Sequence, residues 1–213
     1  IFTLIFGRIA KIPTDGIPYI LFSTVAIVPW TYMSNAMNGA SQSLVAGQTI
    51  LGKIYFPRVI FPLTPVIAKL IDFLISMVLI IAVMIYYGVP LTPQIAYLPL
   101  FVLVMVAVPI GVGLWLSALA IRYRDVKFAM AFAVRMLMYT APIVYSATNI
   151  PDVYRFYYSL NPIVSVIEGF RGCILGTSLH WQFIWPGMLT SVILVVTGLL
   201  YFRKMEKVFV DVI

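Results

Sequence analysis

The chain has 213 residues, of which 62% are hydrophobic and only 10% are charged. Soluble globular domains carry about 25% charged residues, so this composition excludes an ordinary soluble domain and indicates a helical membrane protein. The formal net charge is +7, but the basic residues stand singly at the ends of apolar runs, which excludes the basic stripe of a nucleic-acid-binding protein. The single cysteine, Cys173, excludes an intramolecular disulfide, and we expect no metal site. We treat residues 1–213 as one transmembrane domain.

Six apolar runs are predicted to span the membrane. The first, Ile1–Ile9, begins in the middle of a hydrophobic stretch and without methionine, so we expect a truncated first span and a missing N-terminal interfacial helix. The other runs have the length that a membrane crossing requires. They are Ile20–Gly39, Phe61–Tyr87, Ile95–Ile121, Val126–Tyr145 and Phe183–Phe202.

The segment of residues 146–180 is too polar and too interrupted by proline for a full crossing. It predicts two short helices, Asp152–Leu160 and Val164–Gly176, separated by Asn161-Pro162, because proline disfavours helical geometry in the residue before it. The expected fold is therefore an all-α integral membrane bundle of six spans with two short helices at one face.

Lysine and arginine gather in three turns. Gly47–Leu63 carries Lys53 and Arg58, Arg122–Lys127 is the densest charge cluster, and Arg203–Lys207 closes the last span. Short basic segments resist translocation across the membrane, so all three turns are predicted to be cytoplasmic. The C-terminus is then cytoplasmic as well.

Apart from these turns, two charged pairs and a single arginine are candidates for a functional role. Lys69 and Asp72 share one helix face, which favours a structural ion pair near the cytoplasmic interface over an ion relay. Arg135 has no local partner, so it should face the bundle interior or a subunit interface, where it could contact an anionic substrate. Glu168 and Arg171 are predicted to form a solvated pair rather than a catalytic site, because no second acid or base lies nearby.

The turn Gly47–Lys53 matches most of a phosphate-binding loop, G-x-x-x-x-G-K. The next residue must be Ser or Thr to hold Mg²⁺, but it is Ile54, and no buried strand precedes the turn. The sequence therefore predicts no ATPase site on this chain. A chain that has a structured cytoplasmic turn but no ATPase site suits a transporter driven by a separate ATPase subunit.

Aromatic residues cluster at the predicted outer face. They are Tyr145, Tyr154, Phe156, Tyr157 and Tyr158. Such residues form the aromatic belt of many membrane proteins, but aromatic faces also stack on sugar rings. The residues alone leave both interpretations open.

Four short segments, spread through most of the chain, resemble the permease subunit of type-2 ABC exporters for O-antigen, teichoic acid or capsular polysaccharide. Each is short, and it is their order and spacing that make the resemblance specific. The segments are Lys53…Phe56-Pro57-Arg58…Pro62-Leu63, Arg122-Tyr123-Arg124-Asp125-Val126, Ala141-Pro142-Ile143-Val144-Tyr145 and Asn161-Pro162-Ile163…Arg171.

The resemblance implies a homodimer in the inner membrane, bound to two ATPase subunits that hold ATP and Mg²⁺, with no cofactor on this chain. A lipid-linked polysaccharide, O-antigen-like, would pass through a channel between the two subunits. Residues 146–176 would form two periplasmic gate helices, and Ala46–Tyr55 would form a coupling helix that docks on the ATPase.

The residues to which these roles fall form three groups. The ATPase-coupling group is Ala46, Gly47, Gln48, Thr49, Lys53, Tyr55 and Arg58. The second cytoplasmic turn contributes Arg122, Arg124 and Asp125. The glycan channel and gate group is Tyr145, Tyr154, Phe156, Tyr157, Tyr158 and Arg135.

Other classes of protein remain as alternatives. A drug- or lipid-exporting ABC permease of the same superfamily is the nearest one. A secondary transporter would need further intramembrane ionisable groups and would often show an inverted repeat. A membrane-embedded lipid-processing enzyme would need a constellation of His, Asp or Glu at one face, and the only histidine is His180.

Overall fold

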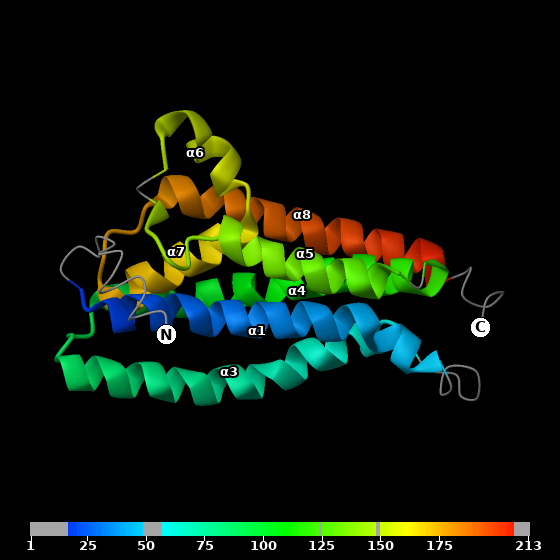
Figure 1. Ribbon diagram of the computed structural model, residues 1–213, viewed down its shortest axis with the longest axis horizontal. Helices are drawn as coiled ribbons and strands as arrows, with labels where there is room; N and C mark the ends of the chain where they lie inside the picture. Colours follow the sequence, from blue (N-terminus) through cyan, green and yellow to red (C-terminus); the bar gives the residue numbers. More distant parts are fainter. Residues whose placement is uncertain (1–16, 49–56, 124, 148–149, 207–213) are drawn as a thin grey trace.

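The computed structural model describes residues 17–48, 57–123, 125–147 and 150–206, and within these ranges every regular element is helical. Five helices run side by side along the long axis of the molecule (Figure 1). They are α1 (Tyr19–Ala46), α3 (Ile60–Tyr87), α4 (Leu98–Arg122), α5 (Val126–Thr140) and α8 (Trp181–Glu206). Three shorter elements lie at one end, namely the 3-10 helix η2 (Pro93–Tyr97), α6 (Asp152–Ser159) and α7 (Pro162–Leu175).

Helix α1 is the centre of the bundle and contacts α3, α4, α5 and α7. Its core residues are buried along its whole length, from Leu21 through Met33 to Leu44. Small residues let α4 approach it closely, since a side chain at Gly113 would collide with Ala40. Gly113 thus permits close helix approach, because only a residue without Cβ fits there.

Helices α4 and α8 also meet backbone to backbone. A Cβ at Gly198 would lie 2.7 Å from the carbonyl oxygen of Gly111. Beside this contact, Trp115 stacks on Tyr201 with ring centroids 4.2 Å apart. The Trp115 indole also donates a 3.2 Å hydrogen bond to Thr197 Oγ1. Close packing and interhelical hydrogen bonds hold helices together where lipid provides no hydrophobic driving force.

Three of the described segments are long and apolar enough to cross a membrane: α3, the continuous run Pro93–Arg122, and α8. The apolar part of α5, Phe128–Thr140, is shorter. Helix α1 is long, but its second half carries many hydroxyl and amide side chains. The first predicted span, residues 1–9, lies outside the described residues, so the count of six spans stays a prediction.

Two predicted boundaries are wrong. Helix α1 continues past Gly39 to Ala46, and Ala40, Ser41 and Leu44 of this extension are buried in the bundle. Helix α5 ends at Thr140 instead of Tyr145. Ala141 precedes Pro142 and adopts an extended backbone with φ −98° and ψ 148°, as steric contact with the proline ring requires.

The two short helices predicted in the segment of residues 146–180 are confirmed as α6 and α7. Asn161 caps α7, since its side chain accepts a 3.0 Å hydrogen bond from the Ile163 amide, and Pro162 occupies the first turn. In Figure 1, α6 stands away from the bundle next to α8, whereas α7 lies within the bundle at the same end. Their role as gate helices stays a prediction.

Candidate functional site

The two helices that flank the turn of residues 47–63 are locked together where the turn begins and ends. A side chain at Gly47 would collide with the ring of Phe61, and a Cβ at Gly39 would lie 2.9 Å from Pro65 Cβ. Phe61 also packs against the buried cluster that contains Leu44. The positions at which the turn leaves α1 and enters α3 are therefore defined by packing.

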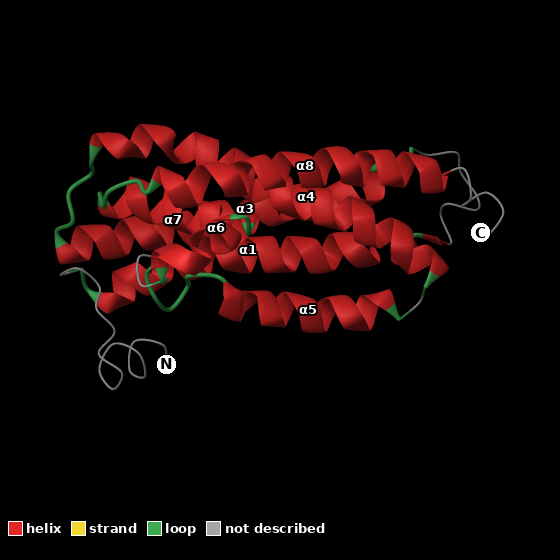
Figure 2. Cartoon of the chain, turned by 90° about the horizontal axis from the view of Figure 1, so that it is seen from above, coloured by secondary structure: helices red, strands yellow, loops and turns green. Residues whose placement is uncertain are grey.

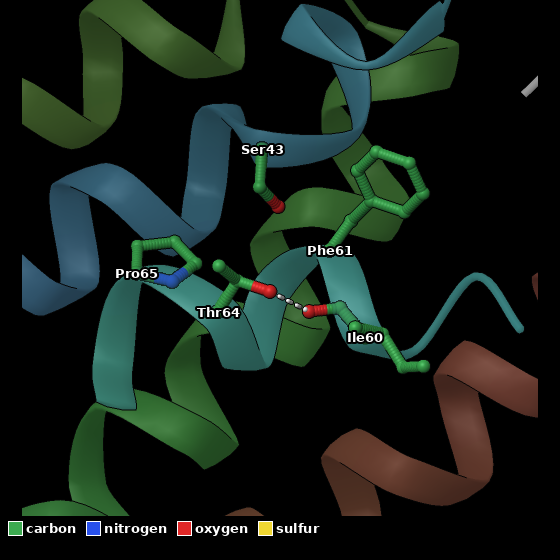
Figure 3. Close-up of a pocket in the computed structure, with 5 residues that line it drawn as sticks. All are labelled: Ser43, Ile60, Phe61, Thr64 and Pro65. Atoms are coloured by element: carbon green, nitrogen blue, oxygen red, sulfur yellow. Dashed lines mark hydrogen bonds between the residues drawn. The ribbon is translucent and has the colours of Figure 1, made fainter. Parts of the chain in front are cut away.

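A notch of about 320 Å³ lies between these two helix ends (Figure 3). Its lining residues are Ser43, Ile60, Phe61, Thr64 and Pro65. Both hydroxyls are used within their own helices, because Thr64 donates to the Ile60 carbonyl and Ser43 donates to the Ala40 carbonyl, each at 2.8 Å. The notch is therefore apolar in character and sits directly beside the turn.

The predicted cytoplasmic residues gather at one end of the bundle. Ala46 ends α1 and is followed by Gly47 and Gln48, and Arg122 ends α4, at the end where α3 begins and α8 finishes (Figure 1). Arg58 Nη1 donates a 2.8 Å hydrogen bond to the Glu206 carbonyl oxygen. Asp125 lies between α4 and α5 at this end. Of the other residues predicted here, Thr49, Lys53, Tyr55 and Arg124 lie outside the described residues.

Lys69 and Asp72 form the predicted ion pair, with Nζ and Oδ2 2.8 Å apart. The pair lies on the surface of α3, where the two side chains are 43% and 63% exposed. Neighbouring residues of that surface, such as Ile71 and Ile75, are exposed aliphatic side chains. The pair therefore interrupts an otherwise apolar outer face of the bundle.

Helix α5 presents an exposed face that differs from that of α3. Its exposed residues include Phe128, Phe132, Arg135, Met136 and Tyr139. A helix of 15 residues is about 22 Å long, which is less than the roughly 30 Å of a bilayer core. Figure 2 shows α5 at the margin of the bundle. Arg135 was expected to face either the bundle interior or a subunit interface. Its exposure excludes the interior of its own bundle, and its place at a subunit interface stays a prediction.

At the opposite end of the bundle lies a buried ion pair that sequence reasoning assigned to solvent. Glu168 and Arg171 of α7 are only 8% and 3% exposed, and Arg171 Nη1 lies 3.1 Å from Glu168 Oε1. The expectation of a solvated pair is wrong, because α7 is enclosed by α1, α4 and α8. No sequence signal pointed to this burial, because Ser165, Glu168 and Arg171 follow one face of α7 and give it the pattern of an amphipathic surface helix.

Arg171 makes further contacts beyond its carboxylate partner. Its two terminal nitrogens donate to the carbonyl oxygens of Tyr145 and Ile143, each at 3.0 Å. The guanidinium carbon also lies 3.7 Å from the centre of the Phe22 ring of α1, a cation–π contact. One arginine thus joins α7, α1 and the segment that follows α5.

The five aromatic residues predicted at the outer face divide into two groups. Tyr154, Phe156 and Tyr157 are exposed on α6. Tyr158 and Tyr145 are half-buried, and the Tyr158 hydroxyl donates to the Tyr145 hydroxyl at 3.2 Å. Burial first, and this hydrogen bond second, raise the pKa of Tyr158, which therefore stays protonated and able to donate.

These features define a multi-pass helical membrane protein whose helices α1 and α3 pack closely where they flank a turn at one end, with the short helices α6 and α7 at the other end. Comparison with known proteins gives the family. The ABC-2 type transporter model matches residues 1–175, and the chain belongs to that family.

Relatives extend the similarity over the whole chain. Two O-antigen export system permease proteins RfbA from Klebsiella pneumoniae are each 26% identical over 216 residues, covering 100% of this chain and 82% of the relative. An O-antigen export system permease protein RfbA from Myxococcus xanthus is 22% identical over 173 residues, covering 80% of this chain and 66% of the relative. The chain is therefore a membrane permease of the ABC-2 transporter family.

Proposed function

We propose that this chain is the channel-forming subunit of an ATP-driven exporter that moves a lipid-linked, O-antigen-like polysaccharide across the inner membrane. The observation that carries this proposal is the full-length similarity to permeases named for O-antigen export. In the proposal, two copies assemble with two ATPase subunits, which bind ATP and Mg²⁺, while this chain holds no cofactor. Its C-terminus is cytoplasmic, at the end where the basic turns gather.

The exposed face of α5 supports a water-filled path rather than a lipid contact. A lone arginine facing hydrocarbon is costly, so charged residues in membrane helices face protein or water. Arg135 lies among the exposed rings of Phe132 and Tyr139. Flat aromatic faces stack on sugar rings, and a guanidinium binds phosphate or carboxylate groups. Many weak contacts of this kind suit a polymer that must slide.

The outer aromatics extend the proposed path. Tyr154, Phe156 and Tyr157 are exposed on α6 and offer their rings to a passing chain. Tyr145 and Tyr158 lie half-buried behind them and are joined by a hydrogen bond. In the proposal, the first group contacts the glycan at the exit, and the second group holds the exit in place.

The contacts of the residues that flank the turn between α1 and α3 support coupling to an ATPase. Packing at Gly47 and the Arg58–Glu206 hydrogen bond tie the turn to α1, α3 and α8. A push on the turn would therefore reach three helices at once. Residues Ala46–Tyr55 are proposed to dock on the ATPase, with Lys53 and Tyr55 among the contacts, while Arg122, Arg124 and Asp125 shape the neighbouring turn.

The experiment is deletion of this permease gene, followed by detection of surface polysaccharide and of lipid-linked glycan inside the cell. The proposal expects loss of the surface polymer and internal accumulation of the glycan, both reversed by the intact permease with its ATPase. Unchanged surface polysaccharide together with new sensitivity to apolar drugs would instead favour a drug-exporting permease.

The coupling contact has its own test. In a Cys173→Ser background, single cysteines at Gln48 or Thr49 should crosslink to cysteines on the ATPase subunit. Labelling of both positions by an impermeant thiol reagent added from the periplasmic side would show that the proposed orientation is inverted.

A further inference from the structure

The buried pair of Glu168 and Arg171 holds one short segment, residues 141–147, which follows α5 on the way to α6 and is called the outer connection here. Arg171 donates to the carbonyls of Ile143 and Tyr145, and Glu168 Oε1 accepts a 3.4 Å hydrogen bond from the Ala147 amide. Every second residue of the connection from 143 to 147 is therefore bound to the pair.

Hydrophobic stability alone gives no reason for this arrangement. A buried ion pair loses its hydration, and well-packed apolar residues of similar volume often stabilise a protein as well or better. The rest of α7 is apolar and buried, as at Phe170 and Ile174. The pair supplies directional hydrogen bonds. The planar guanidinium binds two carbonyl groups at once, which no apolar side chain can do.

The outer connection lies between the two surfaces assigned to the glycan path. On one side it continues from α5, whose exposed face carries Arg135. On the other side it leads to α6, whose Tyr158 bonds back to the Tyr145 hydroxyl. The carbonyl of Tyr145 is bound by Arg171 at the same time. Arg171 thus affects the placement of both the exposed face of α5 and the aromatic face of α6 through its contact with Tyr145.

We propose that Arg171 is a positioning residue for export: by clamping the outer connection to α7 and α1, it sets where α5 ends and where α6 presents its aromatic side chains. This inference rests on the proposed function, but the clamp itself can be tested without any substrate. Arg171 does not contact the polymer in this proposal; it acts through Tyr145 and Ile143.

The informative substitution is Arg171→Lys, which keeps the charge and the pairing with Glu168. An ammonium is a point charge on a flexible stem and cannot hold two carbonyls and stack on Phe22 together. Glu168→Gln is the milder change, because the amide oxygen can still accept from Arg171 and from Ala147. Arg155→Lys is the matched control, since Arg155 pairs with Asp152 at the same spacing and donates to the Ile150 carbonyl, but on the partly exposed surface of α6.

The chain carries its own reporter. Cys173 is the single cysteine, lies in α7 two residues after Arg171, and is buried. In the complete transporter with its ATPase in lipid vesicles, an impermeant maleimide should label Cys173 slowly in the wild type and in Arg155→Lys. Loss of hydrogen bonds to a charged group raises the population of the open state, in which Cys173 is accessible, about tenfold. Cys173 in Arg171→Lys should therefore be labelled about tenfold faster. The labelling rate of Cys173 in Glu168→Gln should lie between those in the wild type and in Arg171→Lys.

A second probe distinguishes release of the outer connection alone from loosening of the whole helix bundle. A Gln48→Cys substitution in a Cys173→Ser background reports on the other end of the bundle, and Arg171→Lys should leave its labelling rate unchanged. Equal labelling of Cys173 in the Arg171→Lys and wild-type proteins would overturn the clamp. Faster labelling at both ends would reduce Arg171 to a general folding role and would also overturn the proposal.

Export then tests the positioning role. The assembled Arg171→Lys transporter should keep its basal ATP hydrolysis but display markedly less polysaccharide at the cell surface than Arg155→Lys. If the Arg171→Lys strain displays the full amount of surface polysaccharide although Cys173 is labelled fast, Arg171 holds the outer connection but has no part in export. Failure of the polysaccharide proposal itself would appear in a different comparison: the deletion strain would display as much surface polymer as the wild-type strain.

Discussion

Arg58 and Glu206, which are 148 residues apart in the sequence, meet through a 2.8 Å hydrogen bond from the guanidinium to the backbone carbonyl oxygen. Arg58 stands just before α3, and Glu206 is the last residue of α8. The carbonyls of the last helical turn have no partner within the helix, and a basic side chain there is favourable. The contact joins the proposed coupling turn to the C-terminal helix.

Arg58→Ala should therefore uncouple the turn from α8. We expect a loss of about 1 kcal/mol in the free energy of unfolding, discounted for partial exposure, and a clear fall in substrate-stimulated ATP hydrolysis. Arg203→Ala, which removes an exposed charge near the same helix end, is the control. If both variants behave alike in thermal unfolding and ATP hydrolysis, net charge rather than the hydrogen bond is responsible.

Gly47→Ala tests the packing at the beginning of the turn. The added methyl group would collide with the Phe61 ring, which must then move out of the cluster with Leu44 and Phe202. Overpacking of this kind costs about 1–3 kcal/mol, so the assembled transporter should melt at a lower temperature. A second substitution, Phe61→Leu, should restore much of the loss. A double variant no better than Gly47→Ala would contradict the proposed collision.

The exposed face of α5 predicts a transport defect without a folding defect. Phe132→Ala, Tyr139→Ala and Arg135→Gln should each lower surface polysaccharide while leaving assembly and basal ATP hydrolysis intact. Arg135→Lys should retain more export than Arg135→Gln, because the charge remains. Leu74→Ala on the apolar face of α3 is the control. Equal export by the Leu74 and Phe132 variants would indicate that α5 faces lipid.

The two groups of outer aromatics should respond differently to substitution. Tyr158→Phe removes the donor to Tyr145 and should destabilise the outer end by about 1 kcal/mol, whereas Tyr157→Phe should have no effect on stability. Combined replacement of Tyr154, Phe156 and Tyr157 by alanine should reduce export without changing the melting temperature. Unaltered export by that triple variant would leave these rings as an aromatic belt only.

Much of the helical pattern was accessible from the sequence because membrane crossing imposes strong local rules. Apolar runs of the required length predicted α3, α4 and α8, and Asn161-Pro162 correctly separated α6 from α7. The end of α5 could have been predicted too, since Pro142 restricts the residue before it. The grouping of the basic turns at one end follows from the alternating direction of successive spans.

The sequence by itself determined that this is an all-helical membrane protein, and its ordered motifs indicated the transporter family. Only the tertiary structure decided which charges are buried. Glu168 and Arg171 looked like a solvated pair because spacing along a helix says nothing about what surrounds it. Arg135 was expected to face either its own bundle or a partner, and packing excluded the first. Burial is a property of neighbours that arrive from other parts of the chain. Phe22 of α1 and Tyr145 of the outer connection both reach Arg171 from separate earlier segments, and no local pattern records that meeting.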